Sequence, residues 1–172
     1  QCSGGRSKNP IYHRVSIRKY QERPVENEKI LQILQAGMQA PSACNQQPWE
    51  FYVVTDKEKI GLLSQATSYA GCAAGAPVVI IPVYRTESLP APSMIPIDMG
   101  LSLENIWLET DALGLGGVCI GISPVPEFME PFCRILQLPD NLKPFCLFPL
   151  GYPSEERPQQ DRFELNRIHF VE

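Results

Sequence analysis

Residues 97–124 read IDMGLSLENIWLETDALGLGGVCIGISP, and this stretch decides the fold. From residue 96 onward, apolar side chains cover nearly the whole circumference of a helix, which Gly114, Gly116 and Gly117 then end. A helix that is apolar all round needs cover on every side. In a chain this short we expect a central helix or one that packs against a second copy of the chain. The apolar positions are Ile97, Met99, Leu101, Leu103, Ile106, Trp107, Leu108 and Leu113.

Helices and strands are predicted to alternate on either side of this stretch. Segments with a 3.6-residue apolar period indicate helices, and short runs of β-branched and aromatic residues indicate strands. We expect helices over residues 24–40, 55–69, 96–113 and 126–136, and strands over 49–54, 77–84, 118–122 and 145–150. The second helix would begin at a capping box in residues 55–58. This alternation predicts an α/β or α+β fold with one sheet.

The composition fits one compact domain. The chain has 172 residues, of which 44% are hydrophobic and 20% are charged, enough for a single core. Its net charge of -4 and its pI near 5.3 argue against a nucleic-acid binder, which needs clustered Lys and Arg. The longest purely apolar run, residues 78–81, is far shorter than the roughly 20 residues that span a bilayer. We therefore expect no transmembrane segment.

The two chain ends are expected to differ from this domain. Residues 1–11 read as a disordered N-terminal lead, and residues 12–172 as one domain that ends in an extended C-terminal arm. The six cysteines show no CxxC spacing, which disfavours a zinc site, and reduced thiols favour the cytoplasm. The sequence Cys-Ser-Gly-Gly at Cys2 also resembles the start of a processed bacterial lipoprotein, so a lipid-anchored or periplasmic protein stays open.

A basic segment follows the lead. Arg14, Ser16 and Arg18 occupy alternate positions, and in an extended chain such side chains share one face. Two guanidiniums and a hydroxyl on one face suit a phosphate, because arginine binds phosphate oxygens bidentately. Solvated surface arginines are the alternative.

A polar loop reads PSACNQQPW over residues 41–49. Four neutral polar side chains stand there between two prolines, among them the amides of Asn45 and Gln47. The loop is either a solvated connection or a rigid rim that hydrogen-bonds a flat heterocycle.

Other catalytic motifs are weak. The chain has no Walker A sequence and no GxGxxG after a strand, and its only histidines, His13 and His169, lie near opposite ends. We therefore expect no metal site and no Ser-His-Asp triad. The carboxylates near the apolar helix, Asp98, Glu104, Glu109 and Asp111, are expected to be solvated or salt-bridged rather than proton donors.

Several motifs in order resemble the FMN-dependent nitroreductase family. They are SIRKY at 16–20, APSACNQQPWEFYVV at 40–54, the stretch 97–124, FPLGYP at 148–153 and DRFELNRIHF at 161–170. The resemblance covers nearly the whole chain from about residue 12. It implies an α+β, nitroreductase-like fold with a central mixed β-sheet flanked by helices. It also implies an intertwined homodimer with two FMN sites at the interface, where the apolar helix would pack.

The resemblance also implies the cofactor-binding residues. The basic segment would hold the FMN phosphate through Arg14, Ser16 and Arg18. Val15 stands where the family commonly has Arg, so one charge is missing and the backbone of Val15 would contribute instead. Arg162, near the C-terminus, would be a further phosphate ligand.

The flavin ring would meet two further segments. Pro41, Ser42 and Ala43 would border the isoalloxazine from the second subunit, while Asn45 and Gln47 would reach its polar edge or the ribityl chain. Ile120 and Gly121 lie in the loop whose backbone N–H would approach the flavin N5.

The implied activity is hydride transfer from NADH or NADPH through FMN to a nitroaromatic, quinone or similar small acceptor, by a ping-pong mechanism. No side chain need act as an essential acid or base, since the flavin carries the chemistry. The compact region 70–95 predicts an open substrate pocket without a long lid. The alternatives are an FMN-binding store or sensor of low turnover, a specialised relative such as a reductive dehalogenase or flavin-fragmenting enzyme, and a dimeric scaffold without cofactor.

Overall fold

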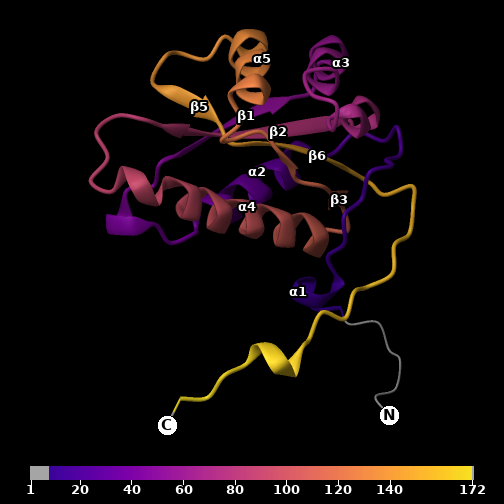
Figure 1. Ribbon diagram of the computed structural model, residues 1–172. Helices are drawn as coiled ribbons and strands as arrows, with labels where there is room; N and C mark the ends of the chain where they lie inside the picture. The colour runs from indigo at the N-terminus through magenta and orange to yellow at the C-terminus, as the bar shows by residue number, and fades with distance from the viewer. Residues whose placement is uncertain (1–7, 172) are drawn as a thin grey trace.

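A single sheet with helices on both faces organises the protein. The computed structural model describes residues 8–171. Its strands are β1 (Trp49–Val54), β2 (Val78–Arg85), β3 (Gly116–Gly117), β4 (Ile120–Gly121), β5 (Leu142–Pro144) and β6 (Cys146–Gly151). Its α-helices are α1 (Pro10–His13), α2 (Asn27–Met38), α3 (Lys57–Ser64), α4 (Ile95–Ala112) and α5 (Pro126–Leu136). Figure 1 shows α3 and α5 on one face of the sheet and α2 and α4 on the other.

The sheet runs in the order β1-β2-β6-β3, with β4 also paired to β6 and β5 to β2. The named strand pairs are antiparallel, and the parallel component is an isolated bridge between Ser16 and Gly117. The expected α+β fold, a central sheet flanked by helices, is confirmed.

Side chains on the two faces of β2 belong to two different apolar clusters. Val79 and Ile81 pack toward α3 and α5, whereas Val78 and Ile80 pack toward α2 and α4, as the two-residue period of a strand requires. Each of these side chains is almost fully buried. A strand covered on both faces needs no polar side, which is why residues 78–81 read as a continuous apolar run.

Helix α4 packs closely on α2 but is only half covered. A methyl group on Gly37 would lie 2.7 Å from Cγ1 of Ile106, so the Ile106 side chain of α4 packs directly on the backbone of α2 at Gly37. On the opposite side of α4, Ile97 and Leu101 remain 55% and 42% exposed. In the single chain, one side of α4 is therefore exposed to solvent, although its apolar sequence predicted burial on every side.

Three details differ from the sequence expectations. Helix α3 is capped by Asp56, whose Oδ1 accepts from the Lys59 N–H at 2.9 Å, and it ends at Ser64, well before residue 69. In place of the expected strand 118–122 the chain forms two short strands in one register, β3 before that range and β4 within it. They are interrupted at residues 118–119 because Pro149, which faces Val118 in this register, has no N–H to donate. The three-residue strand β5 was not expected.

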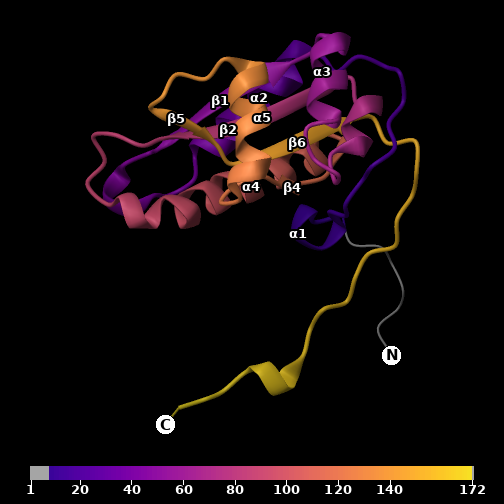
Figure 2. The same ribbon diagram turned by 45° about the horizontal axis from the view of Figure 1, so that its top comes forward.

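The C-terminal segment lies away from the sheet. Figures 1 and 2 both show the C-terminal segment, with its single turn of 3-10 helix η4 (Leu165–Arg167), as an extended arm that leaves the body. All of residues 161–171 are exposed, including Phe163, Leu165 and Phe170. Most of the expected N-terminal lead, with Cys2 and its lipid question, lies outside the described residues. Helix α1 begins at Pro10. No helix within residues 8–171 combines the length and apolarity needed to cross a membrane.

Candidate functional site

The polar loop of residues 41–48, here called the rim loop, has an unusual backbone. Its short 3-10 turn η1 spans Ala43–Asn45, and Cys44, Asn45 and Gln47 adopt positive φ angles of 51°, 51° and 43°. Non-glycine residues rarely adopt such angles, so the surrounding structure must hold the loop in this shape.

Asp98 and Arg85 hold the rim loop in place through hydrogen bonds. Asp98 is only 1% exposed, and its carboxylate accepts from the Ala43 N–H at 2.9 Å and from Gln46 Nε2 at 2.6 Å. The guanidinium of Arg85 donates to the carbonyl oxygens of Gln46 and Gln47, at 3.1 and 2.8 Å. The expectation that Asp98 is solvated or salt-bridged is wrong, because Asp98 is buried in the first turn of α4, where it lies against the rim loop.

The three amide side chains of the loop differ in their exposure to solvent. Gln46 is buried, and its side chain also exchanges hydrogen bonds with the backbone of Ala91. Asn45 and Gln47 are exposed and hydrogen-bond each other, with 2.9 Å from Gln47 Nε2 to Asn45 Oδ1. Gln46 therefore fixes the loop while Asn45 and Gln47 face outward. Pro41 is exposed, and Ser42 and Ala43 are half-buried, beside these outward amides.

The basic segment, residues 14–18, runs along β3. The Ile17 N–H donates to the Gly117 carbonyl at 3.0 Å, and Ser16 bridges the same residue. The Arg18 N–H donates to Glu155 Oε1 at 2.7 Å, and this bond lowers the pKa of Glu155. Within this segment Ile17 is buried, whereas the side chain of Arg18 is exposed.

The guanidinium of Arg14, in the basic segment, has a nitrogen without a hydrogen-bond acceptor among the described residues. This guanidinium lies 4.3 Å from the centre of the Trp107 ring, and the nitrogen without a partner is its buried Nη1. An enclosed cationic donor is costly unless an acceptor meets it. The residues present therefore fit an anionic group such as a phosphate.

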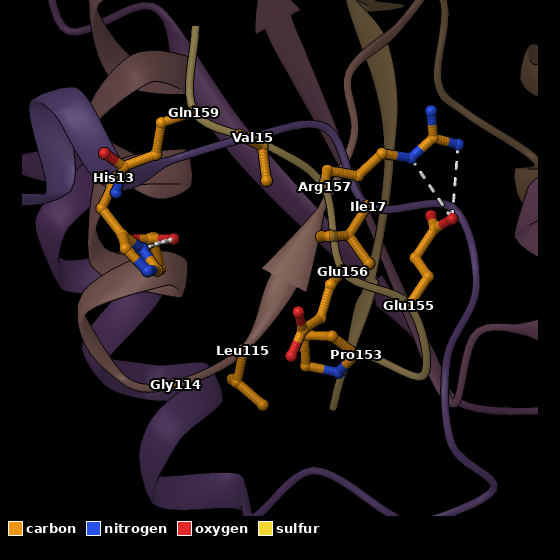
Figure 3. A pocket seen from close by; sticks show the side chains of 11 residues that line it. His13, Val15, Ile17, Gly114, Leu115, Pro153, Glu155, Glu156, Arg157 and Gln159 are labelled. Carbon is orange, nitrogen blue, oxygen red and sulfur yellow. Dashed lines mark hydrogen bonds and ion pairs between the residues drawn. The ribbon is translucent and has the colours of Figure 1, made fainter. Parts of the chain in front are cut away.

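A cavity of about 250 Å³ lies beside the basic segment and has the wrong charge for phosphate. Figure 3 shows Val15 and Ile17 at its wall, with Glu156 inside it and the Arg157–Glu155 ion pair to one side. Asp111, paired with His13 at 2.8 Å, adds a further carboxylate. Arg14, Ser16 and Arg18 are not among the residues that line this cavity.

Strand β4 brings Ile120 and Gly121 to the edge of β6. Ile120 is buried and pairs with Leu147, whereas Gly121 is exposed and has no heavy atom within 4 Å of where a Cβ would stand. The chain reaches β4 directly from β3, which contacts the basic segment. These two predicted parts of the site thus lie on connected elements.

The rim loop and the basic segment stand at opposite ends of α4. Asp98 beneath the rim loop lies in the first turn of α4, and Asp111, which binds His13, lies in the last. At 1.5 Å per residue, about 20 Å of helix separates them. Arg162 lies on the exposed C-terminal arm. One protomer therefore does not bring all the predicted site residues together.

The described residues offer little for other chemistry. Among residues 8–171 no group of three His, Cys, Asp or Glu side chains could hold a metal ion. The cysteines in this range are free thiols. Between β1 and α4 the chain forms short elements: α3, the 3-10 turns η2 (Gly71–Gly75) and η3 (Pro92–Met94), and β2.

Comparison with known proteins identifies the family. The profile of the Nitroreductase family matches residues 11–152. An Archaeoglobus fulgidus protein that carries the combined name NADH dehydrogenase/NAD(P)H nitroreductase is 38% identical over 167 residues, which cover 92% of this chain and 94% of that protein. The chain belongs to the Nitroreductase family.

Two solved structures share the fold. A protein from Clostridium acetobutylicum described as an NADH oxidase superimposes with a TM-score of 0.91 at 42% identity, covering 95% of this chain and 99% of that one. An FMN-dependent nitroreductase from Clostridium difficile gives a TM-score of 0.88 at 28% identity, covering 95% and 98%.

Proposed function

We propose that this chain is an FMN-dependent oxidoreductase that takes hydride from NADH or NADPH and passes it to a small oxidised acceptor such as a nitroaromatic or a quinone. The names of its relatives support the class of reaction. The observation that carries the proposal is the enclosed guanidinium of Arg14, which has no acceptor at Nη1 among the described residues and so fits the phosphate of FMN.

The active form is proposed to be a homodimer, because each protomer holds two separated half-sites. If the α4 helices of two protomers pack antiparallel about a two-fold axis, the rim loop of one lies beside the basic segment of the other. The same packing would cover Ile97 and Leu101, which a single chain leaves exposed. The apolar side chains of the C-terminal arm would then pack on the neighbouring protomer, which makes the dimer intertwined.

In this dimer each group of predicted site residues would bind a different part of FMN. Arg14, Ser16 and Arg18 hold the phosphate with the backbone of Val15, and Arg162 joins them from the arm. The rim loop borders the flavin ring through Pro41, Ser42 and Ala43, and Asn45 and Gln47 donate or accept at its polar edges. Ile120 and Gly121 present backbone to the ring. Bound FMN supplies the hydride-carrying chemistry.

Spectroscopy and kinetics test the proposed function. We expect purified protein to be yellow or to become so with FMN, to oxidise NADH or NADPH with a quinone, and to give the parallel double-reciprocal lines of a ping-pong reaction. Protein that stays colourless with added FMN would contradict the proposal.

A flavin store or sensor is the second candidate, favoured by Val15, which leaves the basic segment one charge short of the family pattern. It would bind FMN and oxidise NAD(P)H only negligibly. The same quinone assay separates the two functions.

The dimer is tested by Leu101→Asp. A carboxylate at this exposed position on α4 would be desolvated without a partner in the dimer, so dimerisation should weaken by about a hundredfold or more. Size-exclusion chromatography should show a monomer, and FMN should be lost with it. Leu62→Asp is the matched control, because Leu62 is 54% exposed but lies on α3, across the sheet. Equal effects of the two changes would exclude α4 as the interface.

A further inference from the structure

The last two turns of α4 contact two consecutive residues of the N-terminal region. Trp107 stacks on Arg14, with 4.3 Å from Cζ to the ring centre, and Asp111, one turn later on the same face, pairs with His13 at 2.8 Å. The start of the basic segment is therefore fixed to a rigid helix by a cation–π contact and a hydrogen bond.

The indole is itself held in place. Trp107 meets Phe148 of β6 edge to face, with ring centres 5.8 Å apart and planes at 71°. Phe148 is fully buried in the sheet, so it cannot move aside to let the indole turn. The plane on which Arg14 lies is thus set by the core of the protein.

This contact contains donors without acceptors. Both Nη1 of Arg14 and Nε1 of Trp107 are buried and unpartnered among the described residues, and both atoms can only donate. Stacking satisfies the face of a guanidinium but none of its in-plane N–H groups. The Arg14–Trp107 pair is therefore oriented yet still lacks acceptors, as expected of a group arranged in advance for an anion.

We propose that Trp107 is a positioning residue for cofactor binding, which orders the Arg14 guanidinium for the phosphate of FMN before the flavin arrives. The inference rests on the proposed function. Because an arginine without this support would lose side-chain entropy on binding, removal of the indole should weaken recognition of the phosphate and leave recognition of the ring unchanged.

Riboflavin separates these two effects, because it is FMN without the phosphate. Full-length protein freed of flavin is titrated with each ligand, with quenching of flavin fluorescence as the measure of Kd. Wild-type protein should prefer FMN. In Trp107→Leu the Kd for FMN should rise about tenfold, and in Trp107→Phe, which keeps an aromatic face, only about two- to threefold. The Kd for riboflavin should change less than about twofold in both.

Phe128→Leu is the matched control. Phe128 also belongs to an edge-to-face pair, with Tyr69, but it lies on α5 across the sheet. Its replacement should leave the ratio of the two dissociation constants unchanged.

Each other outcome counts against the inference. If Trp107→Leu weakens both ligands equally, or changes neither, the positioning role is wrong while the proposed function stands. Wild-type protein that binds no FMN overturns both. Should Trp107→Leu fail to fold, Arg14→Lys replaces it, because lysine keeps the charge without the planar stack. That variant should lose the preference for FMN, and its retention would overturn the inference.

Discussion

Replacing Asp98 by alanine is expected to lower the free energy of unfolding by about 3 kcal/mol and to abolish retention of FMN. The change removes the acceptor for the Ala43 N–H and for one N–H of the buried Gln46 amide, which keeps its bond to the Ala91 carbonyl. Two N–H groups thus lose their acceptor in a loop that already has residues at positive φ. Urea unfolding followed by circular dichroism measures the first effect, and the flavin spectrum of the purified protein the second.

The matched control is Glu127→Ala. Glu127 also lies in the first turn of a helix, α5, but it is exposed, so its loss removes only a favourable interaction with the helix dipole, about 0.3–1 kcal/mol. Asp98→Asn should fall between wild type and Asp98→Ala, since one acceptor oxygen remains. An Asp98→Ala protein as stable as the control would show that Asp98 does not support the rim loop.

Replacing Gly117 by alanine is expected to destabilise the protein by about 2–3 kcal/mol and to weaken FMN binding. The new methyl would lie 2.6 Å from Cζ of Phe148 and 3.0 Å from the Pro149 carbonyl oxygen, and neither the buried ring nor the backbone can yield easily. Since Gly117 also holds Ser16 and Ile17, any shift of β3 displaces the basic segment. Thermal unfolding and FMN titration measure the two effects.

Gly61→Ala provides the comparison. No heavy atom lies within 4 Å of a methyl at this position in α3, so the change should stabilise the protein by about 0.5–1 kcal/mol through helix propensity. If Gly117→Ala behaved like Gly61→Ala, the close contact of β3 with Phe148 would be refuted.

Much of the fold could be predicted from local signals. Helix α5 and strand β1 have the expected bounds, because Pro126 starts one and a run of aromatic and β-branched residues forms the other. The break between β3 and β4 could not be found in their own residues, since it depends on a proline in the partner strand β6. Strand pairing is a long-range property that no window of sequence contains.

The candidate site was predicted in the same uneven way. Alternation in an extended segment predicted a shared face for Arg14, Ser16 and Arg18. In the structure Arg14 lies against Trp107, whereas the side chain of Arg18 is exposed. The contacts of Asp98, Arg85 and Trp107 were not predicted, since each of these side chains meets a residue far away in the chain. A carboxylate in the first turn of a largely apolar helix was the one available signal for Asp98. The assignment of Arg14, Val15, Ser16, Arg18 and Arg162 to the phosphate remains a prediction, as do the flavin-ring contacts.

Because α4 contacts the rim loop near one end and the basic segment near the other, its length sets the distance between the two proposed half-sites. One inserted residue would advance one end by 1.5 Å and rotate it by about 100° relative to the other. In the proposed homodimer, that change would misalign both proposed composite sites at once. Changes that alter the substrate range are therefore expected to leave the length of this helix unchanged.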